Sequence, residues 1–172
     1  MFLLPVAIVA PSIIIGDTVR RLATGNENMD ALAIRARVAV YSLVYGVSPY
    51  VVMAIIHNES AGNASNFLGD LNLGNGPSIG PMQVSRATAV DLGLWTPPDD
   101  TSAQDDADAF TALSSDIGLG VRWGCRILRQ KLDDNGGDYP SAIRAYNGSN
   151  VASLTYQQNA LSFLKSAYGL TL

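Results

Sequence analysis

Residues 48–60, SPYVVMAIIHNES, predict a short apolar helix with one carboxylate near its end, around which the rest of the chain is interpreted. Ser48 supplies a helix cap, and Pro49 takes the first helical position, where a proline costs no hydrogen bond. Four residues recur at i, i+3, i+4 and i+7 and therefore share one helical face: Val52, Ile55, Ile56 and Glu59. Glu59 continues a stripe that is expected to be buried.

Glu59 is therefore the first candidate for chemistry. A carboxyl group at the wet edge of an apolar stripe has its charged form disfavoured, so its pKa is expected to rise. A carboxylic acid that stays protonated near neutral pH can act as a general acid. The plainer reading of this stretch alone is a helix-end glutamate that faces water. His57 and Asn58 are expected to point away from the stripe.

The composition is typical of one folded domain. The chain has 172 residues, a length sufficient for a hydrophobic core. Hydrophobic residues make up 48% and charged residues 15%, a composition that argues against disorder. A net charge of −4 gives no basic footprint for nucleic acid. With one histidine and one cysteine, the chain holds no internal disulfide and no Cys/His zinc cluster. We expect no metal or cofactor, and a buried, unreactive thiol at Cys125.

The first residues, MFLLPVAIVAPSIIIG, are the most hydrophobic stretch. They are too short to span a bilayer comfortably and are interrupted by Pro5 and Pro11. A secretory signal usually begins with positive charge, whereas the first basic residue here is Arg20. We predict an apolar N-terminal arm over residues 1–25 and a domain over residues 26–172. The arm is expected to pack on the domain, a partner protein or a lipid interface.

The rest of the chain predicts a mainly α fold. A capping box formed by Thr24 and Glu27 opens the next helix and Gly46 closes it. The apolar spacing places the other helices at 27–45, 82–92, 108–132, 139–146 and 154–168.

Glycines and acids mark two further features. Gly118, Gly120 and Gly124 lower the helix propensity of 108–132, so we expect them to permit the close approach of another helix. Residues 94–110 hold five aspartates and read as a solvated acidic loop that enters this helix. They lack the ligand spacing and central glycine of a calcium loop.

Residues 61–81, AGNASNFLGDLNLGNGPSIGP, read as an extended loop or a small, ragged hairpin. A loop of this length in a compact domain is usually functional, and this one follows Glu59 directly, so we expect it to line a cleft. Asp70 is the candidate second carboxylate, because paired carboxylates flank the bond in most sugar hydrolases. A turn residue that bonds its own backbone is the favoured reading of Asp70.

Four short motifs occur in a fixed order along residues 40–168. They are YGVSP at 45–49 leading into AIIHNES at 54–60, SIGPMQ at 78–83, IGLG at 117–120 followed by GGD at 136–138, and AYNG at 145–148. Each motif is weak alone, but the ordered set resembles the lysozyme-like domain of the lytic transglycosylase (SLT) family.

The resemblance implies cleavage of peptidoglycan between N-acetylmuramic acid and N-acetylglucosamine. Glu59 would be the single acid/base. It would protonate the bond oxygen and then deprotonate the muramic acid's 6-hydroxyl, which closes a 1,6-anhydro ring without a second carboxylate. Tyr146 would hydrogen-bond or orient Glu59. The residues implied in shaping the sugar subsites are Ser60, Met82, Gln83 and Asn147.

Plainer readings and departures from the family pattern stand beside these roles. Met82 also fits an ordinary core residue, although the sugar subsite is the favoured interpretation, and Asn147 fits a turn or cap residue equally well. Pro81 stands where the family has leucine, and the loop between Glu59 and Gln83 is longer than usual. A longer loop could place a second acid or a water and give a hydrolysing muramidase, as in goose-type relatives of the fold. A structural adaptor that keeps the fold is the third hypothesis.

The size, the charge and the N-terminus of the chain indicate where the protein acts. A small, acidic, wall-degrading domain without a convincing signal peptide predicts a bacteriophage virion component. The N-terminal arm would then dock on tail or baseplate proteins. The alternative is a bacterial periplasmic or envelope enzyme held by its apolar N-terminus.

Overall fold

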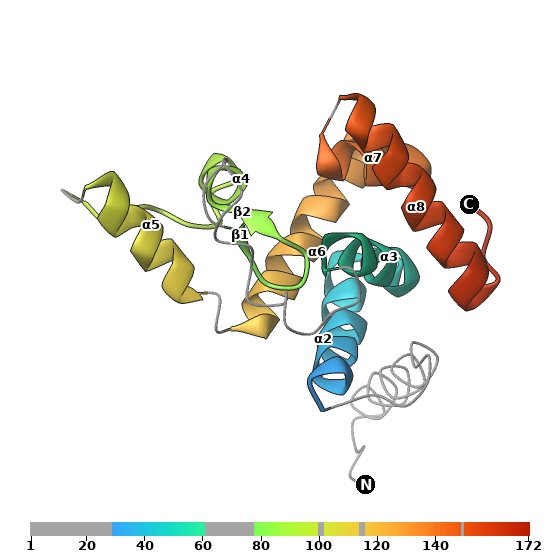
Figure 1. Ribbon diagram of the computed structural model, residues 1–172, viewed down its shortest axis with the longest axis horizontal. Helices are drawn as coiled ribbons and strands as arrows, with labels where there is room; N and C mark the ends of the chain where they lie inside the picture. Colours follow the sequence, from blue (N-terminus) through green and yellow to red (C-terminus); the bar gives the residue numbers. More distant parts are fainter. Residues whose placement is uncertain (1–28, 61–77, 100–101, 114–115, 149) are drawn as a thin grey trace, which may run out of the picture.

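The computed structural model describes residues 29–60, 78–99, 102–113, 116–148 and 150–172 (Figure 1). The predicted N-terminal arm, the capping box at Thr24 and Glu27, and Asp70 lie outside these residues. The described part consists of helices and one short β-hairpin, so the prediction of a mainly α fold is confirmed.

Helices make up most of the described chain. In order, the elements are α2 (Met29–Tyr45), α3 (Pro49–Ser60), β1 (Ser78–Ile79), β2 (Val84–Ser85), α4 (Arg86–Asp91), α5 (Ala103–Ala112), α6 (Ile117–Asp134), α7 (Tyr139–Asn147) and α8 (Val151–Tyr168). None of the helices among the described residues has the length and apolar character to cross a bilayer.

Helix α6 lies between α5 and the hairpin on one side and α3 and α8 on the other (Figure 1), and it takes part in two hydrophobic clusters. Val121, Cys125 and Leu128 face the larger cluster, which α6 shares with α2, α3, α7 and α8. Trp123 and Ile127 face a smaller cluster formed with the hairpin, α4 and α5. Burial raises the pKa of the Cys125 thiol to about 12, which agrees with the expected unreactive cysteine.

Helix α3 packs its apolar face into the larger cluster. Val52 and Ile55 are fully buried and Ile56 is 3% exposed, so the predicted apolar stripe is confirmed. The stripe packs against α2, α6, α7 and α8, and this packing fixes the end of α3. Glu59, in the last turn of α3, is therefore held by the core rather than by a loop.

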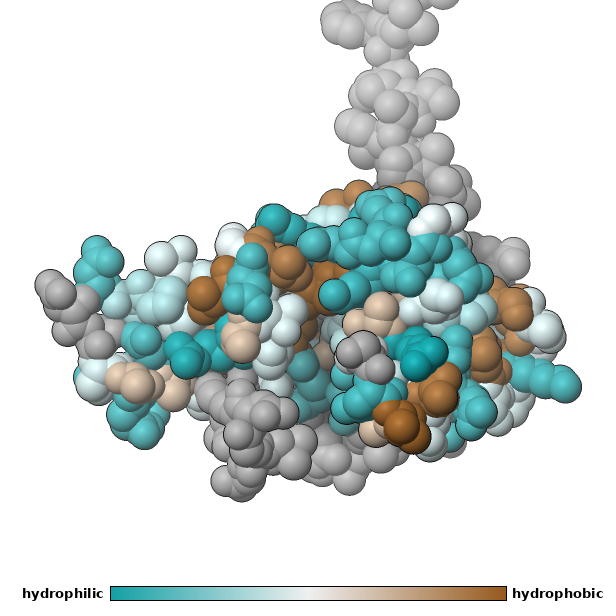
Figure 2. Space-filling model, turned by 90° about the horizontal axis from the view of Figure 1, so that it is seen from above, coloured by the Kyte–Doolittle hydropathy of each residue, from teal (hydrophilic) through white to brown (hydrophobic). Residues whose placement is uncertain are grey.

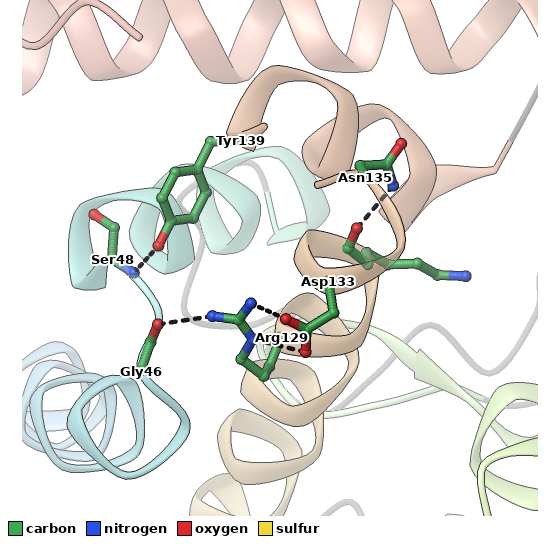
Figure 3. A network of polar contacts seen from close by, with 7 residues as sticks. Gly46, Ser48, Arg129, Asp133, Asn135 and Tyr139 are labelled. Atoms are coloured by element: carbon green, nitrogen blue, oxygen red, sulfur yellow. Dashed lines mark hydrogen bonds and ion pairs between the residues drawn. The ribbon is translucent and has the colours of Figure 1, made fainter. Parts of the chain in front are cut away.

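Polar contacts fix the start of α3 (Figure 3). The Arg129 guanidinium of α6 donates to the Gly46 carbonyl at 3.3 Å and forms an ion pair with Asp133. The Ser48 backbone amide donates to the Tyr139 hydroxyl at 2.7 Å. These contacts anchor the turn between α2 and α3 to α6 and α7, so both ends of α3 are restrained.

The hairpin replaces the first turn of a predicted helix. The expected helix over 82–92 was wrong at its start, because 78–85 form an antiparallel pair with Ile79 opposite Val84. Gly80 adopts φ +70° and Pro81 follows it in a turn closed by a 3.0 Å hydrogen bond from the Gln83 amide to the Gly80 carbonyl. Proline suits the second position of such a turn because its ring fixes φ. Helix α4 then begins with Ser85 as its cap.

The predicted helix over 108–132 is in fact two helices. Helix α5 ends at Ala112, and α6 begins anew where the Asp116 side chain accepts from the Leu119 amide at 3.0 Å. The predicted acidic loop is also shorter than expected, because Ser102 and Asp105 form a capping box that opens α5. Acidic side chains in this first turn are favourable beside the positive end of the helix dipole.

Two glycines of α6 let the hairpin approach the helix backbone. A Cβ at Gly120 would lie 2.6 Å from the Gly80 Cα, and a Cβ at Gly124 would lie 2.7 Å from the Met82 Cβ. The expectation of close approach is confirmed at these positions, although the neighbour is the hairpin and not a helix. At Gly118, the neighbouring element is α2, through Arg37.

The surface seen in Figure 2 is mostly hydrophilic, with apolar residues in small groups between polar ones. Among the described residues, α2 exposes the large hydrophobic side chains Leu32, Leu43 and Val44.

Gly124→Ala tests the close approach of the hairpin. The added methyl would collide with Met82, which is fully buried, so we expect a loss of about 2 kcal/mol in the free energy of unfolding. Chemical denaturation measures this loss. Gln130→Ala, at an exposed position of the same helix, is the control and should change stability by less than about 0.5 kcal/mol. Equal stability of the two variants would show that the contact is not tight.

Candidate active site

A polar pocket of about 220 Å³ lies between the end of α3, the hairpin with α4, and the end of α7. Its described lining consists of Glu59, Gln83, Val84, Ser85, Thr88, Ile127, Tyr146 and Asn147. Glu59 is the one ionisable carboxyl in this described lining. The pocket therefore combines one acid with amide and hydroxyl groups.

The Glu59 carboxyl is held in a poorly solvated position. Burial raises its pKa from 4.5 to about 7, in agreement with the prediction made from the apolar stripe. The Tyr156 hydroxyl donates to Glu59 Oε1 at 2.8 Å, and this hydrogen bond acts in the opposite direction because it stabilises the charged form. Desolvation is the larger effect, so a substantial fraction of Glu59 is protonated at neutral pH.

Tyr156 was missed in the sequence. It lies on α8, and the Asn58 side-chain amide donates to its backbone carbonyl at 2.8 Å, which ties α8 to the end of α3. Burial and the neighbouring Glu59 charge raise the pKa of the Tyr156 hydroxyl, so it stays a donor. Nothing near Tyr156 in the sequence indicates a partner 97 residues away; the contact arises only when α3 and α8 pack.

Tyr146, which was expected to hydrogen-bond or orient Glu59, lines the same pocket as Glu59, but its hydroxyl donates to another acceptor. The Tyr146 hydroxyl donates to the Met82 backbone carbonyl at 3.0 Å. The physical reason is that the hairpin turn brings this carbonyl to the end of α7, where it is a better-placed acceptor. Burial raises the pKa of the Tyr146 hydroxyl well above its ordinary value, and the nearby Glu59 charge raises it further.

Met82 and Gln83 were both expected to shape the sugar subsites, but only Gln83 lines the pocket. The Met82 side chain is fully buried in the larger cluster and does not line the pocket, so its plainer reading as core is correct. Gln83 lines the pocket and adopts φ 47°, a conformation that is unusual for a residue with a side chain. Its side-chain amide nitrogen donates to the Gly80 carbonyl at 3.1 Å, in addition to the backbone hydrogen bond that closes the turn. Non-glycine residues in this region cluster at functional sites.

Of the other predicted site residues, one lines the pocket and two cannot be placed in it. Asn147 ends α7 and lines the pocket. Ser60 ends α3, and its side chain, like Asp70, lies outside the described part of the chain. Ser85 and Thr88 were not predicted, although both hydroxyls line the pocket and lie 2.8 Å apart. The signal for them was the helix cap Ser85 after a Gly-Pro turn.

No three His, Cys, Asp or Glu side chains of the described residues gather in a way that could hold a metal ion.

A mainly helical domain with a buried carboxyl in a polar pocket has the arrangement of a lysozyme-like enzyme. The family profile described as Transglycosylase SLT domain matches residues 38–168, which is most of the chain. The chain therefore belongs to the transglycosylase SLT family, whose members are lytic transglycosylases that act on peptidoglycan. No curated protein and no solved structure matched the chain.

The pH dependence of activity tests the environment of Glu59. We expect the rate of peptidoglycan cleavage to fall as the pH rises through about 7, because Glu59 donates a proton only in its protonated form. Tyr156→Phe removes a hydrogen bond to the carboxylate and should raise the pKa of Glu59. The high-pH limb of the activity profile, where the rate falls, should therefore move to a pH about one unit higher. The kcat should also fall because the carboxyl is less well oriented.

Tyr146→Phe is the matched control for this prediction. It removes the hydrogen bond to Met82 and leaves the Tyr156–Glu59 contact in place, so the high-pH limb should stay where it is. An unmoved limb in Tyr156→Phe, or equal shifts in both variants, would contradict the assignment of Tyr156.

Proposed function

We propose that Glu59 is the single acid/base of this lytic transglycosylase and that the reaction yields a 1,6-anhydro-N-acetylmuramic acid end. The observation that carries the proposal is the Glu59 carboxyl, with a pKa raised to about 7 by burial, in a pocket whose described lining holds no second acid. Such a group can exist in both protonation states near neutral pH, and each half of the reaction requires one of them.

The proposed reaction needs one proton donor that then becomes the acceptor. Protonated Glu59 gives its proton to the oxygen between N-acetylmuramic acid and N-acetylglucosamine, and the bond from this oxygen to C1 of the muramic acid breaks. The carboxylate takes the proton of the muramic acid's 6-hydroxyl as this oxygen bonds to C1. Glu59 is thereby protonated again, and no water is consumed.

Tyr156 and Tyr146 support this cycle in different ways. The hydrogen bond from Tyr156 holds Oε1 and stabilises the carboxylate after it has lost its proton. Tyr146 holds the Met82 carbonyl and so fixes the turn that carries Gln83. We propose Tyr156 as the residue that orients Glu59 and Tyr146 as an indirect support through the turn.

Amide and hydroxyl groups of the pocket are suited to a polyhydroxylated chain. Gln83 and Asn147 offer both donors and acceptors, and the hydroxyls of Ser85 and Thr88 offer the same. We propose that these groups bind the N-acetyl and hydroxyl substituents of the sugars on either side of the cleaved bond. Val84 and Ile127 supply the apolar contacts of the pocket.

Product analysis of digested cell walls tests the proposal. Mass spectrometry should find glycan ends that lack one water relative to hydrolysis products, because the 6-hydroxyl replaces water as the nucleophile. Glu59→Gln keeps the shape of the side chain but cannot donate or accept the proton. It should lower the rate by about 10³-fold or more. Circular dichroism of the variant controls for folding.

Other products or rates would favour another hypothesis. Hydrated ends would make the protein a muramidase of the same fold. Full activity in Glu59→Gln would show that another group supplies the proton. A folded wild-type protein without activity on purified walls would favour the structural adaptor.

We propose that this domain works in a bacteriophage virion, in the tail or baseplate, and opens the bacterial wall locally. The support is the apolar stretch of the first sixteen residues, which precedes a domain with few charged residues and suits docking to another protein. The alternative setting is a bacterial periplasm or envelope.

Removal of residues 1–20 tests the docking role. The truncated protein should retain most of the wall-degrading activity, since the removed residues precede the family match at 38–168, but it should not be incorporated into particles. Quantification of the protein in purified virions measures incorporation. Loss of folding on truncation, or recovery of the intact protein in the membrane pellet of bacteria, would contradict the proposal.

A further inference from the structure

A second pocket, of about 410 Å³, lies between the end of α3 and the second half of α8. Its described lining residues are His57, Asn58, Asn159, Ser162, Phe163 and Ser166. It shares none of them with the described lining of the Glu59 pocket. We call it the α3–α8 pocket.

The pocket is built from one face of α8. Asn159, Phe163 and Ser166 follow one another at i, i+4 and i+7, with Ser162 beside Phe163, so their side chains lie on one side of the helix. Tyr156 precedes Asn159 by three residues, which is about one turn. The pocket therefore begins one turn after the tyrosine that holds Glu59 and extends toward the end of α8.

Histidine and phenylalanine rings form an aromatic surface in this pocket. The His57 and Phe163 rings are stacked, with centroids 4.2 Å apart and an interplanar angle of 15°. Phe163 also packs edge-on against Tyr168, and it contacts the larger cluster, so the stack has a fixed base. His57 is exposed, as expected from its position off the buried stripe of α3.

The polar groups around the stack are neutral amides and hydroxyls. Asn58 uses its side-chain nitrogen to bond the Tyr156 carbonyl, which leaves its side-chain oxygen available as an acceptor. Asn159 and Ser162 are exposed and supply both donors and acceptors. The described lining contains no Lys, Arg, Asp or Glu. A charged peptide would leave its charges unpaired here, whereas a neutral sugar presents an apolar ring face to the aromatic surface and hydroxyl and acetamido groups to the polar side chains.

We propose that the α3–α8 pocket is an accessory binding site for an N-acetylhexosamine unit of a peptidoglycan strand, separate from the site of cleavage. This proposal rests on the proposed function, because it takes the substrate of the Glu59 site as its ligand. A polymer bound at both sites is retained between cleavage events, because the second contact is made at a high effective concentration. The site would therefore favour binding to the insoluble wall over binding to short fragments.

Binding to insoluble walls tests the proposal in the full chain. All proteins carry Glu59→Gln so that the wall is not digested during the measurement. Asn159→Ala combined with Ser162→Ala removes the exposed polar groups of the pocket and should weaken cosedimentation with purified peptidoglycan by about tenfold. Thr155→Ala combined with Gln158→Ala makes equivalent changes at exposed, non-lining positions of α8 and should bind as the parent does. Equal binding by the two double variants overturns the proposal.

A titration with a soluble probe identifies the ligand class. Addition of a tetramer of β-1,4-linked N-acetylglucosamine should shift the backbone amide resonances of His57, Asn159 and Ser162 in NMR spectra, and Asn159→Ala with Ser162→Ala should reduce these shifts. Shifts confined to residues of the Glu59 pocket, or shifts of the α3–α8 pocket only with a free stem peptide, overturn the proposal. Failure of the proposed function is seen separately, as retained activity in Glu59→Gln with an otherwise native protein.

Discussion

The active site depends on the packing of α3, a buried apolar helix that carries one ionisable group in its last turn. Helix α3 packs its stripe into the larger cluster, and this packing brings Glu59 out of full contact with water. Desolvation opposes the charged carboxylate, and a hydrogen bond from Tyr156 partly offsets this effect. The balance leaves a pKa of about 7, which is suited to a group that must donate a proton and then take one back.

The surrounding elements keep this group in place and provide its pocket. Arg129 and Tyr139 anchor the turn at the start of α3, and Asn58 ties its end to α8. On the other side of α6, Gly120 and Gly124 admit the hairpin so closely that Gln83 is brought to the pocket. Tyr146 then bonds the turn from α7. The end of α3, the hairpin and the end of α7 therefore each contribute a polar side chain to the same pocket.

Local features of the sequence were sufficient for part of this account. The spacing of Val52, Ile55 and Glu59 predicted the buried face of α3 and the raised pKa of Glu59, because apolar residues at helical spacing mark the face that the core covers and Glu59 continues that face. The glycines of α6 predicted a close approach but not its partner. The turn Gly-Pro at 80–81 was a hairpin signal that the apolar residues after it obscured.

Contacts between segments that are distant in the sequence could not be predicted from these local patterns. Tyr156 meets Glu59 only because α3 and α8 pack side by side, and Tyr146 prefers the Met82 carbonyl only because the hairpin turn lies against α7. The break between α5 and α6 depended on Asp116 as a cap, which a continuous apolar pattern hid. The stacked rings of His57 and Phe163 likewise come from separate helices.

The protonation state of Glu59 can be measured directly in this chain. The chain contains two glutamates, Glu27 and Glu59, so labelling with ¹³C-glutamate gives two side-chain carboxyl signals, which Glu59→Gln assigns. In a pH titration followed by NMR, the Glu59 signal should show a pKa of about 7. A Glu59 signal that titrates near the ordinary value of about 4.3 would contradict the account, because the carboxylate would then be ionised throughout the neutral range.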